Sequence, residues 1–279
     1  MSRRAIFFRV ASSLLAAIAG LSASGCKAHK EKPHFEAVIQ KVTFAVGDTR
    51  VHAQVSTFGA RPLTLIHLHE DEPTAVQAAV SVLQKRGGRL IELVHSGDRR
   101  VTFSIEGVNY SFDPNRIFSN DGRAKTLRGN APIPFAAYEA VRNFAEEFVS
   151  FFKLDAQPIL IAVHNNGDGD LSIHSYQAGQ TFATDTDQLA ISSEADPDDF
   201  FYVTYKPFFE KLRAARCHVV LQNNQILRDD GSLSVFAGRR QIPYINVEAE
   251  NAHLVAQMHM IEFAIAIAEE SGLAPKVEE

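Results

Sequence analysis

Residues 63–95 read LTLIHLHEDEPTAVQAAVSVLQKRGGRLIELVH and join two apolar segments through a stretch with helical spacing. Residues 63–68 are the first predicted strand and residues 89–95 the second. Between them, residues 74–86 repeat apolar side chains as an amphipathic helix does, and the glycine pair at 87–88 is a good terminator. This strand–helix–strand unit predicts an α/β fold.

The same alternation continues outward from that unit. Further strands are predicted over 158–163, 218–221 and 244–247, and further helices over 134–153, 208–216 and 251–271. Residues 101–112 predict a hairpin with its turn at 106–109, which makes a mixed sheet more plausible than an all-parallel one. The predicted fold is therefore a three-layer α/β/α sandwich, with helices on both faces of a mixed, mostly parallel central sheet.

The N-terminal 25 residues have the layout of an export signal. Arg3 and Arg4 give a basic start, and residues 10–21 are apolar but short of the about 20 residues that span a bilayer. The end of this segment, LSASGC, resembles a bacterial lipoprotein processing site in which Cys26 becomes the lipidated first residue. The alternative is ordinary signal cleavage that leaves Cys26 as a free thiol.

Three parts are expected: a signal peptide over 1–25, a polar lipid-anchored tether over 26–37, and one folded domain over 38–279. This division predicts an exported lipoprotein anchored to a bacterial membrane and facing the periplasm or the cell exterior. The net charge is −5 with no long basic run, which argues against nucleic acid as a partner. The sequence indicates neither the oligomeric state nor which membrane is used.

A cluster of ionisable side chains follows the first strand. His69, Glu70, Asp71 and Glu72 stand between that strand and its helix, and ligands of α/β folds gather at the carboxyl ends of strands. His69 and Glu72 are three residues apart and can converge on one cation; zinc accepts both donor types. Taken alone, the spacing is common by chance, and a solvated helix start whose acidic residues suit the helix dipole is the simpler explanation.

A third candidate ligand comes after the apolar strand 158–163. His164 follows it directly and is succeeded by turn-forming residues; the alternative is an ordinary turn with a partly buried histidine. His67 and His174 compete for this role. His174 lies within an alternating pattern over 171–176 that predicts a strand interior, so His164 is preferred.

The segment DPNRIF at residues 113–118 combines groups suited to binding a carboxylate. The planar fork of Arg116 can bind a carboxylate in two places, and the Asn115 amide can orient it. Asp113 is spaced to accept a hydrogen bond from a metal-bound histidine and so fix its tautomer. The alternative is a loop closed by Pro114 that contains a structural arginine.

Together these elements resemble the zinc carboxypeptidases. HEDE at 69–72, DPNRIF at 113–118, His164 and a late Glu248 after Tyr-Ile-Asn-Val occur in the order of that family's pattern, over about residues 60–255. The resemblance implies a carboxypeptidase-like catalytic domain that binds Zn²⁺ through His69, Glu72 and His164. A His₂Glu set is the catalytic zinc site of carboxypeptidase A.

The resemblance also implies roles around the metal. Asn115 and Arg116 would hold the terminal carboxylate of the substrate. Arg99 would stabilise the oxyanion, although Arg100 could serve equally. Glu248 would be the general base.

Two residues qualify these implied roles. Glu250 is a rival for the general base, only two residues further on. Ile117 replaces an asparagine of the family's segment, and no tyrosine can be placed as the residue that closes over the substrate. These departures affect the substrate pocket more than the metal site.

The function that the resemblance implies is zinc-dependent hydrolysis of a peptide or amide bond near a free carboxylate. For an exported lipoprotein, the substrate class would be a peptide or a peptidoglycan-derived peptide. One alternative is an aspartoacylase-like amidohydrolase of acylated amino acids. The other is a non-catalytic lipoprotein that binds a peptide or a metal and would be indifferent to the loss of Glu248.

Overall fold

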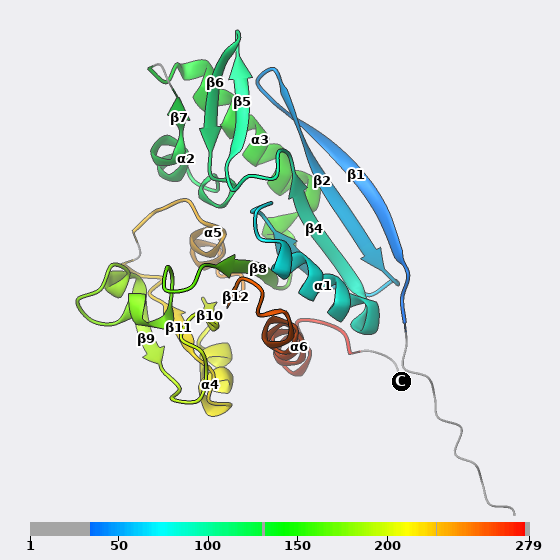
Figure 1. Cartoon of the computed structure of the whole chain (residues 1–279), viewed down its shortest axis with the longest axis vertical. Helices are drawn as coiled ribbons and strands as arrows, with labels where there is room; N and C mark the ends of the chain where they lie inside the picture. The colour runs from blue at the N-terminus through cyan, green and yellow to red at the C-terminus, as the bar shows by residue number, and fades with distance from the viewer. Residues whose placement is uncertain (1–33, 130–131, 227, 277–279) are drawn as a thin grey trace, which may run out of the picture. The chain divides into compact units, whose positions relative to one another are not determined.

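The computed structural model describes residues 34–129, 132–226 and 228–276 (Figure 1). The predicted signal peptide, Cys26 and most of the predicted tether therefore lie outside the described residues. Phe35, near the end of that tether, donates its backbone N–H to the Gln84 carbonyl at 2.8 Å. Its ring is partly buried against one of the two cores, so residue 35 is part of the packed domain.

A nine-stranded sheet, counted within the described residues, forms the centre of the domain (Figure 1). In spatial order its strands are β1 (Ala37–Val46), β2 (Thr49–Phe58), β4 (Gly88–Val94), β3 (Thr64–His67), β8 (Leu160–Asn166), β12 (Tyr244–Glu250), β10 (Phe200–Val203), β11 (Val219–Gln222) and β9 (Thr186–Ala190). A second sheet contains β5 (Val101–Ile105), β6 (Val108–Phe112) and β7 (Arg128–Gly129).

The central sheet is mixed, as predicted, but parallel pairs are not in the majority. Among the described strands, β4, β3, β8 and β12 are joined by parallel pairings, and β10 pairs with β11 in parallel. The other four pairings are antiparallel. No strand was predicted over 37–58, where the structure has β1 and β2. These two strands are joined by only two residues, and so short a connection permits only antiparallel pairing. The parallel strands β4, β3, β8 and β12 lie in the middle of the sheet.

Helices cover both faces of the sheet, which confirms the predicted three-layer sandwich. One layer contains α1 (Pro73–Arg86), α4 (Lys206–Ala214) and α6 (Leu254–Glu270), and the other contains α3 (Phe135–Phe152) and α5 (Leu233–Arg239). The short helix α2 (Asn120–Thr126) contacts α3 and β6. Successive residues of a strand face opposite ways. Leu160 and Ala162 of β8 accordingly belong to one core, and Ile161 and Val163 to the other.

The central strands β8 and β12 extend beyond their predicted ends. β8 was predicted to stop at Val163, yet its pairing with β12 continues through His164 opposite Glu248 and reaches Asn166 opposite Glu250. Both site residues therefore lie inside paired strands rather than at the start of a loop. In the part of the chain that the structure covers, no helix is both long and apolar enough to span a membrane.

Candidate active site

The carboxyl ends of β3 and β8 bring the first three predicted site residues together. His69 comes two residues after the end of β3, and α1 begins at Pro73. The tight turn between them is fixed by the Glu72 N–H, which donates to the His69 carbonyl at 3.1 Å. The Glu72 carbonyl in turn lies 3.1 Å from His67 Nε2. The turn therefore directs the side chains of His69 and Glu72 to the same side.

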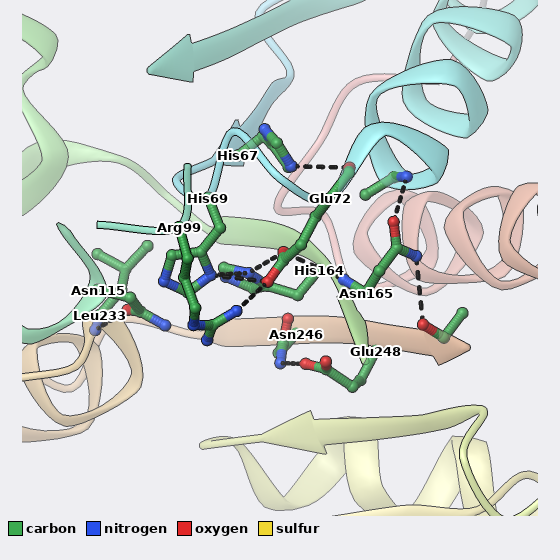
Figure 2. Close-up of polar contacts among 12 residues, drawn as sticks. His67, His69, Glu72, Arg99, Asn115, His164, Asn165, Leu233, Asn246 and Glu248 are labelled. Atoms are coloured by element: carbon green, nitrogen blue, oxygen red, sulfur yellow. Dashed lines mark hydrogen bonds and ion pairs between the residues drawn. The ribbon is translucent and has the colours of Figure 1, made fainter. Parts of the chain in front are cut away.

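His69, Glu72 and His164 meet in a buried cluster (Figure 2). His69 Nδ1 lies 2.8 Å from Glu72 Oε1, and His164 Nδ1 lies 2.8 Å from Glu72 Oε2. The two Nδ1 atoms are 3.2 Å apart. All three side chains are at most 5% exposed. Each of the three residues thus presents one donor atom to a common point, although His69 and His164 are 95 residues apart in the sequence.

The donor set fits a divalent cation. Two unprotonated Nδ1 lone pairs at 3.2 Å repel each other, so a proton or a cation must lie between them. Ligands held about 2.0–2.1 Å from a tetrahedral zinc are roughly 3.3 Å from one another, so the observed spacings require only a small outward shift. Two imidazoles and a carboxylate are also the donor types that zinc accepts.

Asp113 orients His69 from the far side of its ring. His69 Nε2 lies 2.8 Å from Asp113 Oδ1, and this oxygen also accepts the Asn115 N–H at 2.8 Å. A carboxylate on the outer ring nitrogen fixes the tautomer that leaves Nδ1 free to bind a metal. Asp113 therefore lies where it can accept a hydrogen bond from the outer ring nitrogen of His69.

The electrostatics of the cluster favour its charged forms. Burial lowers the pKa of His69, but its hydrogen bonds to Asp113 and Glu72 outweigh burial and raise the pKa to about 9. Burial alone raises the pKa of Glu72, yet contacts with His164 and His69 hold it well below its ordinary value. Burial also raises the pKa of Asp113, and contact with His69 outweighs it. The carboxylates are therefore ready to hold a positive charge.

The two competing histidines lie elsewhere. His67 is fully buried behind the turn, where burial lowers its pKa to about 4. His174 is exposed on a short 3-10 helix, η3 (Ile173–Tyr176), and not in the predicted strand over 171–176. A capping box at Ser172 starts this helix, and such local hydrogen bonds compete with extended structure.

The geometry separates Arg99 from Arg100. Arg99 Nη1 donates to Glu72 Oε1 at 2.6 Å (Figure 2), whereas Arg100 donates to the Ser111 and Thr126 carbonyls. Glu70 anchors the loop that positions Arg99, because its Oε2 accepts the backbone N–H groups of residues 95–97 at 2.6–2.8 Å. That role of Glu70 was not predicted.

Glu248 lies on β12, directly beside His164 of β8 in the register of the two strands. Glu248 is 6% exposed and lines the cavity next to the cluster of His69, Glu72 and His164. Asn246 Nδ2 donates to Glu248 Oε2 at 2.9 Å (Figure 2), a contact that no sequence motif predicted. Glu250 instead lies by His253, 3.4 Å from its Nε2. Of these two glutamates, Glu248 is therefore the one that lines the cavity beside the cluster.

Asn115 and Arg116 line the same cavity. Asn115 is fixed by its Oδ1, which accepts the Leu233 N–H at 3.0 Å. Arg116 Nη1 donates to the Asn115 carbonyl at 2.8 Å, and its Nε lies 3.5 Å from Asp230 Oδ2. Ile117, the departure from the family pattern, is buried in the core and does not line the cavity.

The cavity also includes residues that no sequence motif had indicated. Its volume is about 130 Å³. This space can hold one side chain of a substrate but not a folded polypeptide. The unpredicted lining residues include Tyr176, Tyr202, Tyr244, Asp185 and Asp230. They come from loops and strands without a shared sequence pattern, so only the fold brings them together.

No family model matches the chain, and no curated protein matches it in sequence. Among solved structures, it is similar to a candidate metallopeptidase from Shewanella amazonensis SB2B, at 16% identity and a TM-score of 0.43, over 85% of this chain and 88% of that one. It is also similar to thrombin activatable fibrinolysis inhibitor, at 10% identity and a TM-score of 0.46, over 87% and 70% of the two chains. Tripeptide-bound Csd4, a cell shape determinant of Helicobacter pylori, matches at 12% identity and a TM-score of 0.43, over 87% of this chain and 57% of that one.

Proposed function

We propose that the protein is a zinc-dependent hydrolase that cleaves a peptide or amide bond near a free carboxylate of its substrate. The observation that carries this proposal is the convergence of His69, Glu72 and His164 on one point, with Glu248 beside them on the adjacent strand. A three-residue His₂Glu set is typical of catalytic rather than structural zinc sites, because it leaves a coordination position open.

The side chains around this point support hydrolysis. When bound, the ion would supply Lewis acidity that polarises a water molecule and a carbonyl. Glu248 would accept the proton of the water and pass it to the leaving amine. Arg99 would donate to the developing oxyanion, and Arg116 with Asn115 would hold the carboxylate of the substrate.

A peptide substrate is favoured over a small acylated amino acid because two cavities meet at the cluster. The second cavity shares Glu72, Arg99, Leu171 and Glu248 with the first, and extends toward Asp170. A substrate held at Arg116 can therefore extend past Glu248 into the second cavity. An amidohydrolase of small acylated amino acids would need only one of these spaces.

We further propose that the protein is exported and anchored through Cys26, which makes peptides of the cell envelope, including those of peptidoglycan, the candidate substrates. This part rests on the N-terminal sequence alone. Replacement Cys26→Ser should move the protein from the membrane fraction to the soluble fraction. Retention at the membrane would contradict the anchor.

The hydrolase proposal is tested by measuring zinc content and hydrolysis of blocked dipeptides in parallel. His69→Ala should lose stoichiometric zinc, whereas replacement of the exposed His174 by Ala should keep it. Glu248→Gln should retain zinc and lose hydrolysis by a factor of about 10²–10⁴, the typical contribution of a general base. Glu250→Gln is the matched control and should remain active. A wild-type protein that binds zinc but hydrolyses nothing would instead support a binding protein.

A further inference from the structure

A third cavity, called the basic cavity below, adjoins the first and is lined mainly by cationic side chains. It has a volume of about 370 Å³ and shares only Arg116 and Asp230 with the first cavity. The charged residues among its described lining are the cations Arg100, Arg116, Lys125, Arg128 and Arg228 and the carboxylates Asp113, Asp229 and Asp230. This lining has a surplus of two positive charges, in a chain whose net charge is −5.

The three carboxylates of the basic cavity already have cationic or imidazole partners. These partners are His69 for Asp113, Arg239 for Asp229 and Arg116 for Asp230. Among the described residues, no carboxylate forms an ion pair with Arg100, Lys125, Arg128 or Arg228. The protein therefore leaves the positive surplus of this cavity without a counter-charge.

Arg100 is fixed at the wall of the basic cavity by neutral groups. Its Nη2 donates to the Ser111 carbonyl at 3.1 Å and to the Thr126 carbonyl at 2.5 Å, and its Nε donates to the Ser111 hydroxyl at 3.2 Å. These acceptors orient the guanidinium without neutralising it. A guanidinium that is already oriented loses little conformational freedom when it binds an oxyanion.

Lys125 and Arg128 bring two further positive charges to the basic cavity, from α2 and from β7. Lys125 Nζ donates to the Asp229 carbonyl at 3.0 Å, and Arg128 Nη1 donates to the Leu127 carbonyl at 3.0 Å. Both residues are exposed, so a ligand can reach them from the solvent. Like charges that line one space repel each other, and an anion bound between them relieves this repulsion.

We propose that the basic cavity binds a phosphate group, with Arg100, Lys125 and Arg128 as its cationic partners. A phosphate group carries a charge of about −1.5 to −2 at pH 7, which matches the surplus of the lining better than the single charge of a carboxylate does. Its oxygens also accept the paired N–H groups of arginine. The group comes either as free phosphate or as a monoester of a larger molecule, and both present the same oxygens.

Titration calorimetry of the purified full-length chain with inorganic phosphate tests this site. We expect saturable binding that is about tenfold weaker in Lys125→Gln and in Arg128→Gln, the size of one lost charged hydrogen bond. Sodium chloride keeps the ionic strength constant, so that general screening does not change during the titration. The matched controls are Lys211→Gln and Arg213→Gln, which alter surface cations of α4 outside the basic cavity and should retain the wild-type affinity.

Two results would overturn the proposal. One is the absence of saturable phosphate binding by the wild-type chain. The other is equal affinity in the cavity variants and the control variants, which is also the result expected if phosphate binds at the metal-ligand cluster instead. None of these measurements depends on hydrolysis, so a failure of the hydrolase proposal would leave this test intact.

Glycerol 3-phosphate distinguishes the two sources of the phosphate group. If the ligand is a monoester, glycerol 3-phosphate should bind at least as tightly as inorganic phosphate and with the same loss in Arg128→Gln. If the ligand is free phosphate, the glycerol group should weaken binding. Either result supports a phosphate site in the basic cavity.

Discussion

Glu248 is a carboxylate whose pKa is raised above its ordinary value, chiefly by burial and also by the nearby charge of Glu72. His164 opposes this rise, and so does the hydrogen bond from Asn246, which favours the ionised form and lowers the pKa. A general base acts only when ionised. In the proposed mechanism Asn246 would therefore extend the pH range in which Glu248 acts as the general base, although Asn246 takes no proton itself.

We predict that Asn246→Leu moves the acid limb of kcat/KM to higher pH. The variant removes the donor to Glu248 at similar side-chain size, so the pKa of Glu248 rises and activity is lost at a higher pH as the solution is acidified. The plateau at higher pH should change by only a few fold, because the ionised base is again present there. Zinc content serves as the control, and an unshifted acid limb would contradict the role given to Asn246.

Among the elements, the segment 113–118 depends on close backbone contact with the loop before α5. A Cβ atom added to Gly122 would lie 2.3 Å from Gly231 Cα and 2.6 Å from the Arg116 carbonyl oxygen. The Phe118 N–H donates to the Gly231 carbonyl at 2.9 Å. The position of Arg116 is therefore set by two glycine-bearing segments packed directly against each other.

Gly122→Ala should raise KM for carboxylate-bearing substrates by about tenfold and leave zinc content unchanged. The added methyl group forces the two segments apart, and small displacements of positioning groups have large kinetic effects. Asp121→Ala, the exposed neighbour on α2, is the control and should retain the wild-type KM. A normal KM in the glycine variant would show that the loop adapts without moving Arg116.

The ends of β8 and β12 show why element boundaries were predicted less well than the elements themselves. Asn165 and Asn166 have the composition of a turn, but the Asn165 side chain accepts the Ala75 N–H and donates to the Ala249 carbonyl and Gln257. These partners come from α1, β12 and α6, so tertiary contacts keep the polar residues in the strand. No local pattern could have shown them.

At the scale of the whole molecule, Arg61 joins three distant parts of the chain. It lies after β2 and contacts Glu269 Oε1 of α6 at 2.5 Å, the Arg86 carbonyl of α1 at 3.0 Å and the Pro275 carbonyl near the C-terminus at 2.9 Å. Arg86 also contacts the Glu269 carboxylate, at 2.7 Å. The side chains of Arg61 and Glu269 are 8% and 11% exposed, so one nearly buried carboxylate balances two guanidinium groups.

Glu269→Gln should lower the free energy of unfolding by about 3 kcal/mol, because removing one partner of a buried ion pair leaves the other charge uncompensated. Urea unfolding of the zinc-loaded protein measures this change. The neighbouring Glu270 pairs with Lys211 on the surface, and Glu270→Gln should have little effect. Equal stability of the two variants would mean that the Arg61 cluster contributes little to holding the layers together.

Strand–helix alternation is a local signal and predicted the three-layer architecture, whereas the His69–Glu72–His164 set was predicted through the resemblance to the zinc carboxypeptidases, because the spacing of His69 and Glu72 alone is common by chance. The cavity wall was not predicted. Asp185, Asp230 and Tyr176 lie in loops or short turns with no periodicity, and their meeting depends on crossovers between β8 and β12 that sequence patterns leave unspecified.

Because His164 and Glu248 occupy facing positions on adjoining strands, backbone hydrogen bonds hold them together without any intervening loop. Cavity-lining residues such as Asn115, Arg116 and Asp230 lie instead on segments outside the central sheet. Insertions or replacements in those segments can therefore alter which molecule is accepted while the separation of His164 and Glu248 stays constant. Selectivity could diversify in such a scaffold without the chemistry having to be rebuilt each time.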